Sequence, residues 1–91
     1  MLNKVKTALR ITNNRFDEQI TDLIESAKAD LGIVAEIVEP TDALTREAII
    51  TYCRLHFGQP DDYDRLERSY WEQKAQLRAN PKYKEADDGQ V

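Results

Sequence analysis

Residues 41–58, TDALTREAIITYCRLHFG, constrain the fold most, because this stretch is apolar around most of a helical wheel. Only Arg46, Glu47 and Arg54 clearly favour contact with water. The apolar members are Leu44, Ala48, Ile49, Ile50, Tyr52, Cys53, Leu55 and Phe57. A helix this apolar is expected at the centre of a domain, with other elements packed around it.

Both ends of this helix carry boundary signals. Pro40 disfavours helix at the residue before it, and Thr41 or Asp42 can accept a hydrogen bond from the first free amides. Gly58 can adopt the left-handed conformation that ends a helix. We therefore predict a helix over about residues 43–57.

Two amphipathic helices are predicted before it. Residues 2–10 form the first, and the turn-favouring sequence 12–14, TNN, joins it to a second helix as an αα-hairpin. The second begins at Asn14 or Asp17 and stops at Gly32. Its apolar face consists of Phe16, Ile20, Leu23, Ile24, Ala27 and Leu31.

A fourth helix is predicted over about residues 63–79, between the break at 58–60 and Asn80-Pro81. Residues 33–38, IVAEIV, are predicted as an extended connector, with a strand that pairs between subunits as the alternative. The charged segment 80–91 is predicted to be a flexible C-terminal tail. The predicted fold class is all-α: a small four-helix domain, residues 1–79, with a central apolar helix.

Size and cysteine usage limit the class further. With 91 residues, 41% hydrophobic and 33% charged, the chain fits one domain whose core is thin for its surface, and such domains often gain stability by assembly. The single Cys53 predicts a packing role in a reducing compartment. The sequence lacks the apolar run of roughly 20 residues that a membrane span needs and the apolar core of a signal peptide. A soluble cytosolic protein is expected.

The charge is unevenly distributed. A net charge of -4 and a pI near 4.9 argue against binding nucleic acid by phosphate neutralisation. Residues 1–16 contain four cations and no acid, whereas residues 17–47 contain nine acids and two cations. The polar face of the second helix is predicted to present a negative stripe made of Asp22, Glu25 and Asp30.

The residues needed for catalysis or metal binding are missing. His56 is the only histidine, so a His-based metal cluster or triad is excluded within one chain, and a partly buried capping role is expected. Asp61, Asp62 and Asp64 lack the spacing of a calcium loop and are better explained by helix capping. Since a glycine-rich phosphate loop is also missing, we expect no enzyme, no cofactor and no metal site.

The aromatic group of the last helix is the remaining distinctive feature. Tyr63 and Tyr70 share one face, for which core packing is expected. Trp71 lies about 100° from Tyr70 on the helical wheel. For Trp71, a core position and a subunit or partner interface are both open.

Several segments together resemble a known family. The segments LNKVKTALRI, FDEQITDLIESAKADLGI, AIITYCRLHFG and RLERSYWEQKAQLR occur in the order and spacing of the small head-tail connector (adaptor, head-completion) proteins of long-tailed double-stranded DNA phages, often labelled DNA-packaging proteins. The resemblance covers residues 2–31 and 44–79. The link at residues 33–42 departs from the family pattern.

This resemblance implies a structural virion protein at the head-tail junction, assembled in the host bacterial cytoplasm. It implies a ring of about 12 subunits that docks under the portal protein after DNA packaging and extends the DNA channel. The far face would meet the next head-completion or tail protein, and DNA would pass an acidic wall without specific binding. The uneven charge suits a heterologous subunit contact, whose expected residues are Lys4, Lys6, Arg10, Asp22, Glu25, Asp30 and Trp71. In that contact the three cations would face the three acids of the next subunit.

Two alternatives come from other classes of protein. One is a small helical regulatory or antitoxin-like module that binds a partner protein, with a basic first helix that could touch nucleic acid. The acidic helix after the first turn weakens this alternative, since a helix-turn-helix needs a basic recognition helix. The other is a small hydrolase subunit, which would need a catalytic nucleophile paired with a general base, and the sequence shows no such pair.

Overall fold

The computed structural model of the protein describes residues 1–33, 40, 42–58 and 60–79. It contains four helices in these ranges, α1 (Leu2–Leu9), α2 (Asp17–Leu31), α3 (Ala43–His56) and α4 (Tyr63–Ala79), and no strand among the described residues. The all-α prediction and the four predicted helices are confirmed. The predicted tail at 80–91 and, apart from Ile33, the predicted connector at 33–38 lie outside the described residues.

The helix ends follow local signals in the sequence. The Asp42 carboxylate caps α3 by accepting a hydrogen bond from the Thr45 amide at 3.1 Å. Gly32 ends α2 with a φ of +75°, a backbone conformation that residues other than glycine rarely adopt. Arg10 ends α1 with a φ of +60°, where the backbone is strained for a residue with a Cβ.

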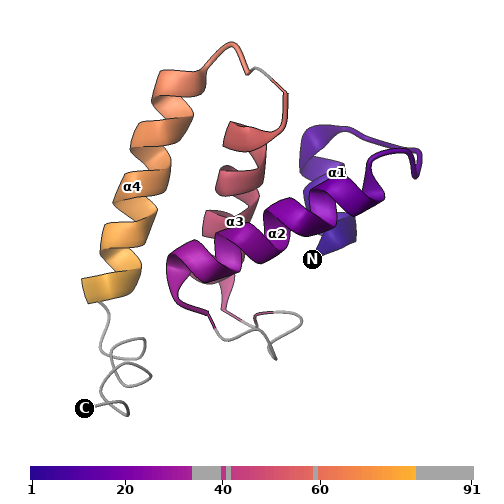
Figure 1. The fold of residues 1–91 in the computed structure, drawn as a ribbon. Coiled ribbons are helices and arrows are strands. Elements are labelled where there is room, and N and C mark those ends of the chain that lie inside the picture. The colour runs from indigo at the N-terminus through magenta and orange to yellow at the C-terminus, as the bar shows by residue number, and fades with distance from the viewer. Residues whose placement is uncertain (34–39, 41, 59, 80–91) are drawn as a thin grey trace.

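Helix α3 is central, as its composition predicts. It contacts α1, α2 and α4, and Figure 1 shows it behind α2 and beside α4. A first core cluster joins α1, α2 and α3 through Val5, Ile20, Ile24, Ala27, Ile49 and Cys53. A second cluster joins α3 to α4 through Ala48, Tyr70 and Leu77. The apolar residues around most of α3 are therefore divided between two packing surfaces.

Cys53 lies in the first cluster with no exposed surface, which confirms its packing role. Burial raises the pKa of its thiol to about 12, because the thiolate would lose its hydration there. The side chain therefore stays protonated at physiological pH and behaves as a small apolar residue.

Several positions differ from the sequence prediction. Leu44, expected on the apolar face of α3, is 43% exposed. Phe16, expected on the apolar face of α2, is the N-cap of that helix and is 37% exposed, and its ring forms a T-shaped contact with Phe57. His56 is exposed rather than partly buried, and the centre of its ring lies 4.3 Å from that of Tyr52, with the two ring planes tilted by 46°. Tyr63 is also 43% exposed. These residues occupy the first or last turn of a helix or its cap, where neighbouring helices do not cover every side.

Candidate interaction site

A polar cluster links α4 to α2, and Tyr70 connects it to the second apolar cluster. The Tyr70 hydroxyl donates a hydrogen bond of 2.5 Å to Asp30 Oδ2, and Lys74 Nζ lies 3.2 Å from the same oxygen. Tyr70 and Lys74 are 4% and 7% exposed, whereas the Asp30 side chain is 40% exposed. One partly exposed carboxylate on α2 thus holds two nearly buried polar side chains of α4.

This arrangement changes the ionisation of its members. The pKa of Asp30 lies below its ordinary value, and the hydrogen bond from Tyr70 is the largest cause. The hydrogen bond and charge of Lys74 and the charge of Arg78 lower this pKa further, whereas partial burial opposes them. Burial first, and then the bond to Asp30, raise the pKa of Tyr70. Asp30 is therefore ionised and Tyr70 protonated at neutral pH.

The lowered pKa of Asp30 makes this link sensitive to acid. A carboxylate whose folded pKa lies below its unfolded value stabilises the fold above the unfolded value, here near 3.8, and this contribution is lost as the pH falls through the folded pKa. We expect the stability advantage of the wild type over Asp30→Asn, measured by urea unfolding, to be larger at pH 7 than at pH 3. An advantage that is the same at both pH values would contradict the assignment.

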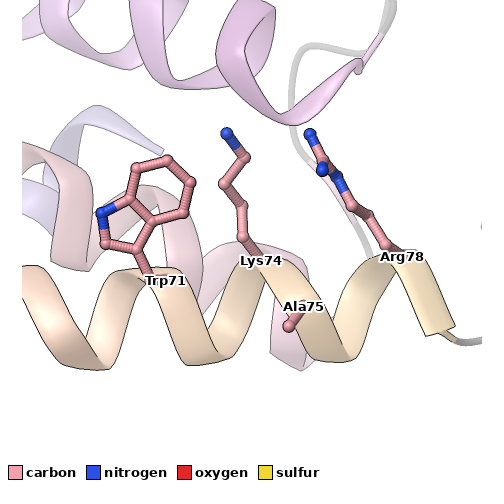
Figure 2. A pocket seen from close by; sticks show the side chains of 4 residues that line it. All are labelled: Trp71, Lys74, Ala75 and Arg78. Atoms are coloured by element: carbon pink, nitrogen blue, oxygen red, sulfur yellow. The ribbon is translucent and has the colours of Figure 1, made fainter.

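Beside this cluster, α4 carries a hollow of about 360 Å³ lined by Trp71, Lys74, Ala75 and Arg78. Figure 2 shows the side chains of Trp71, Lys74 and Arg78 projecting to the same side of α4. The Lys74 ammonium lies 4.7 Å from the centre of the Trp71 ring, within the range of a cation-π interaction. The indole is 58% exposed, so its large apolar surface has little cover within the described part of the chain.

Trp71 is therefore excluded from the core of the chain, and Tyr70 is confirmed there. The expectation that Tyr63 and Tyr70 both pack in the core was right only for Tyr70. Lys74 and Arg78 were missed as members of this site. The signal for them was present, since residues 71, 74, 75 and 78 follow the spacing of one helix face.

The cations predicted at the subunit interface have different environments in the structure. Lys6 Nζ lies 2.8 Å from Asp17 Oδ1 and donates a hydrogen bond of 3.0 Å to Asn14 Oδ1, which fastens α1 to the start of α2. Its side chain is only 12% exposed. Lys4 and Arg10 lie at exposed positions.

The predicted acids also differ from one another. Asp22 is exposed on α2, and the Glu25 side chain is 54% exposed with an oxygen 3.3 Å from Lys28 Nζ. Asp30 is engaged with α4 through Tyr70 and Lys74. The structure therefore joins Asp30 to Tyr70 and Lys74 of α4 and leaves Asp22 and Glu25 exposed on α2.

The described ranges contain no group of three or more His, Cys, Asp or Glu side chains that could hold a metal ion. Among the described helices, none combines the length and apolar character needed to cross a membrane.

Comparison with known proteins decides the family. The model of the phage connector protein family matches residues 1–84. The chain belongs to this family. It is thus a structural connector that acts at the phage head-tail junction, as the order and spacing of its helical segments predicted. No match was found among curated proteins or among solved structures.

Proposed function

We propose that this phage connector protein forms a ring under the portal, extends the DNA channel, and joins the head to the tail after DNA packaging. The family match over residues 1–84 is the observation that carries this proposal. The next head-completion or tail protein would bind the face of the ring opposite the portal.

Two physical features support assembly. The described core consists of two small clusters, and an isolated domain with a core this thin gains stability from association. Trp71 exposes more than half of its surface, which is uncommon for a tryptophan outside an interface.

The net charge of -4 supports a channel wall that repels the DNA backbone and lets the DNA slide.

The subunit contact predicted from the sequence also remains a proposal. Because Lys6 and Asp30 have partners inside the chain, an interface through these two residues would require them to exchange or share those partners. The exposed residues of that set, Arg10, Asp22 and Trp71, need no such change.

The ring is tested by measuring the mass of the purified protein across concentration, with light scattering after size exclusion and negative-stain images. We expect closed rings of about 12 subunits, either alone or when purified portal protein is added. A protein that stays monomeric with the portal present would overturn the proposal. A stable dimer that binds DNA would instead favour a regulatory module.

A further inference from the structure

The hollow on α4 contains a cation and an exposed aromatic ring, so it can bind a surface that carries a carboxylate and a small apolar side chain. Lys74 already faces Asp30, so Arg78 is the cation best placed to meet an incoming acid. The exposed indole of Trp71 offers a flat apolar surface at the other end of the hollow, with Lys74 between it and Arg78 (Figure 2). An acidic stretch with a small residue one or two helical turns away would complement both groups.

Helix α2 presents such a surface on its outer side. Glu18, Asp22, Glu25 and Ala29 are all exposed and follow one another at steps of four, three and four residues, which places them on one stripe. The buried residues Ile20, Ile24 and Ala27 lie on the opposite side of the helix. We call these four exposed residues the acidic stripe.

The two surfaces have matching dimensions. Trp71 and Arg78 are seven residues apart on α4, as Ala29 and Asp22 are on α2, and each separation is about 10 Å along a helix. When two helices run antiparallel, the indole can cover Ala29 while Arg78 meets Asp22. A parallel arrangement would place the indole against Asp22 and Arg78 against Ala29, where the charges do not match.

The acidic stripe that fills the hollow must come from another copy. Within one chain, α2 meets α4 through Asp30, which is turned about 100° from Ala29 on the helical wheel. The stripe of the same chain thus lies on a different side of α2 from the one that meets α4. Every copy carries both surfaces, so the contact can repeat from one copy to the next.

We propose that the hollow formed by Trp71, Lys74, Ala75 and Arg78 binds the acidic stripe of a second copy, with Trp71 over Ala29 and Arg78 beside Asp22. This inference rests on the proposed ring and specifies its subunit contact. In this contact the acids of α2 pair with cations on α4 of the neighbouring copy. The sequence had predicted that they would pair with cations of α1. Burial of the indole provides most of the affinity, and the ion pair sets the orientation.

Trp71 is the only tryptophan, so its fluorescence reports on the contact directly. Emission of the full-length protein is expected to shift to shorter wavelength as concentration rises and the mass increases. Arg78→Glu and Asp22→Arg should each weaken self-association about threefold to tenfold per contact, and the combined variant should recover part of this loss. Arg65→Glu makes the same charge change at an exposed α4 position turned about 120° from Trp71 on the helical wheel. It is the matched control and should assemble as the wild type does.

Arg10→Glu distinguishes this contact from the one predicted for α1, because only the latter would be weakened by it. Circular dichroism of each variant checks that the helices are retained. The inference would be overturned by a wild type whose mass increases to that of a ring while the emission of Trp71 stays unchanged. It would also be overturned by rings that form equally well with Arg78→Glu and Asp22→Arg, a result that leaves the proposed function intact.

Discussion

Replacing Ile49 with alanine is expected to lower the free energy of unfolding by about 2–5 kcal/mol, the largest change among the substitutions considered. Ile49 is fully buried on α3, in the cluster that joins α1, α2 and α3. The shortened side chain would leave a cavity that three helices cannot easily close. Since small domains are stable by only about 5–15 kcal/mol, such a loss is a large part of the total.

Urea unfolding followed by circular dichroism measures this effect. Leu44→Ala is the matched control, because Leu44 lies on the same helix and is 43% exposed. Its substitution should change the stability by about 0.5 kcal/mol or less. Equal losses at both positions would contradict the division between core and surface described for α3.

Replacing Asp30 with alanine is expected to cost about 1–3 kcal/mol, because two nearly buried polar groups would lose their shared partner. The Tyr70 hydroxyl and the Lys74 ammonium both contact this carboxylate. The nearly buried Lys74 ammonium would then lack its ion pair, and leaving a buried charge unpaired is costly. Loosening of α4 relative to α2 should follow.

Two measurements separate this effect from a general loss of negative charge. Glu67→Ala removes an exposed acid from α4 and should cost much less than Asp30→Ala in urea unfolding. The emission of Trp71 should change in Asp30→Ala and stay the same in Glu67→Ala, because the ammonium held by Asp30 lies 4.7 Å from the indole ring. Similar costs for the two variants would rule out a structural role for the cluster.

This cluster also has a consequence for assembly. Asp30 positions Lys74, and Lys74 lines the hollow proposed to bind a second copy. A substitution at Asp30 would therefore weaken the subunit contact, although Asp30 itself is not part of that contact. The shape of the hollow depends on how α4 is fixed against α2.

Much of the fold followed from local signals in the sequence. Helix α2 begins at Asp17, one of the two predicted starts, and stops at the predicted Gly32 cap, while Asp42, one of the two predicted capping residues, caps α3. Hydrogen bonds between residues a few positions apart determine these features, so one stretch of sequence contains the whole signal. The central place of α3 followed from its composition for a similar reason.

The candidate site was predictable only in part. Trp71 stood out in the sequence as a residue for which the core and an interface were both open, and the structure places it on the surface. Asp30 was predicted on an outward stripe with Asp22, but its side chain turns toward α4 and binds Tyr70, forty residues later in the sequence. A helical wheel gives the direction of a side chain relative to its own helix and says nothing about the helix that lies there.

The sequence by itself determined four helices, their ends, the apolar centre and the connector family. Only the tertiary structure decided which exposed charges are already paired, as Lys6 is with Asp17 and Asp30 with Lys74. It also decided that Leu44 and Tyr63 are exposed and that Trp71 lies beside a cationic hollow. The physical reason is range: capping and periodicity act within a few residues, whereas the partner of a side chain depends on how separate helices pack.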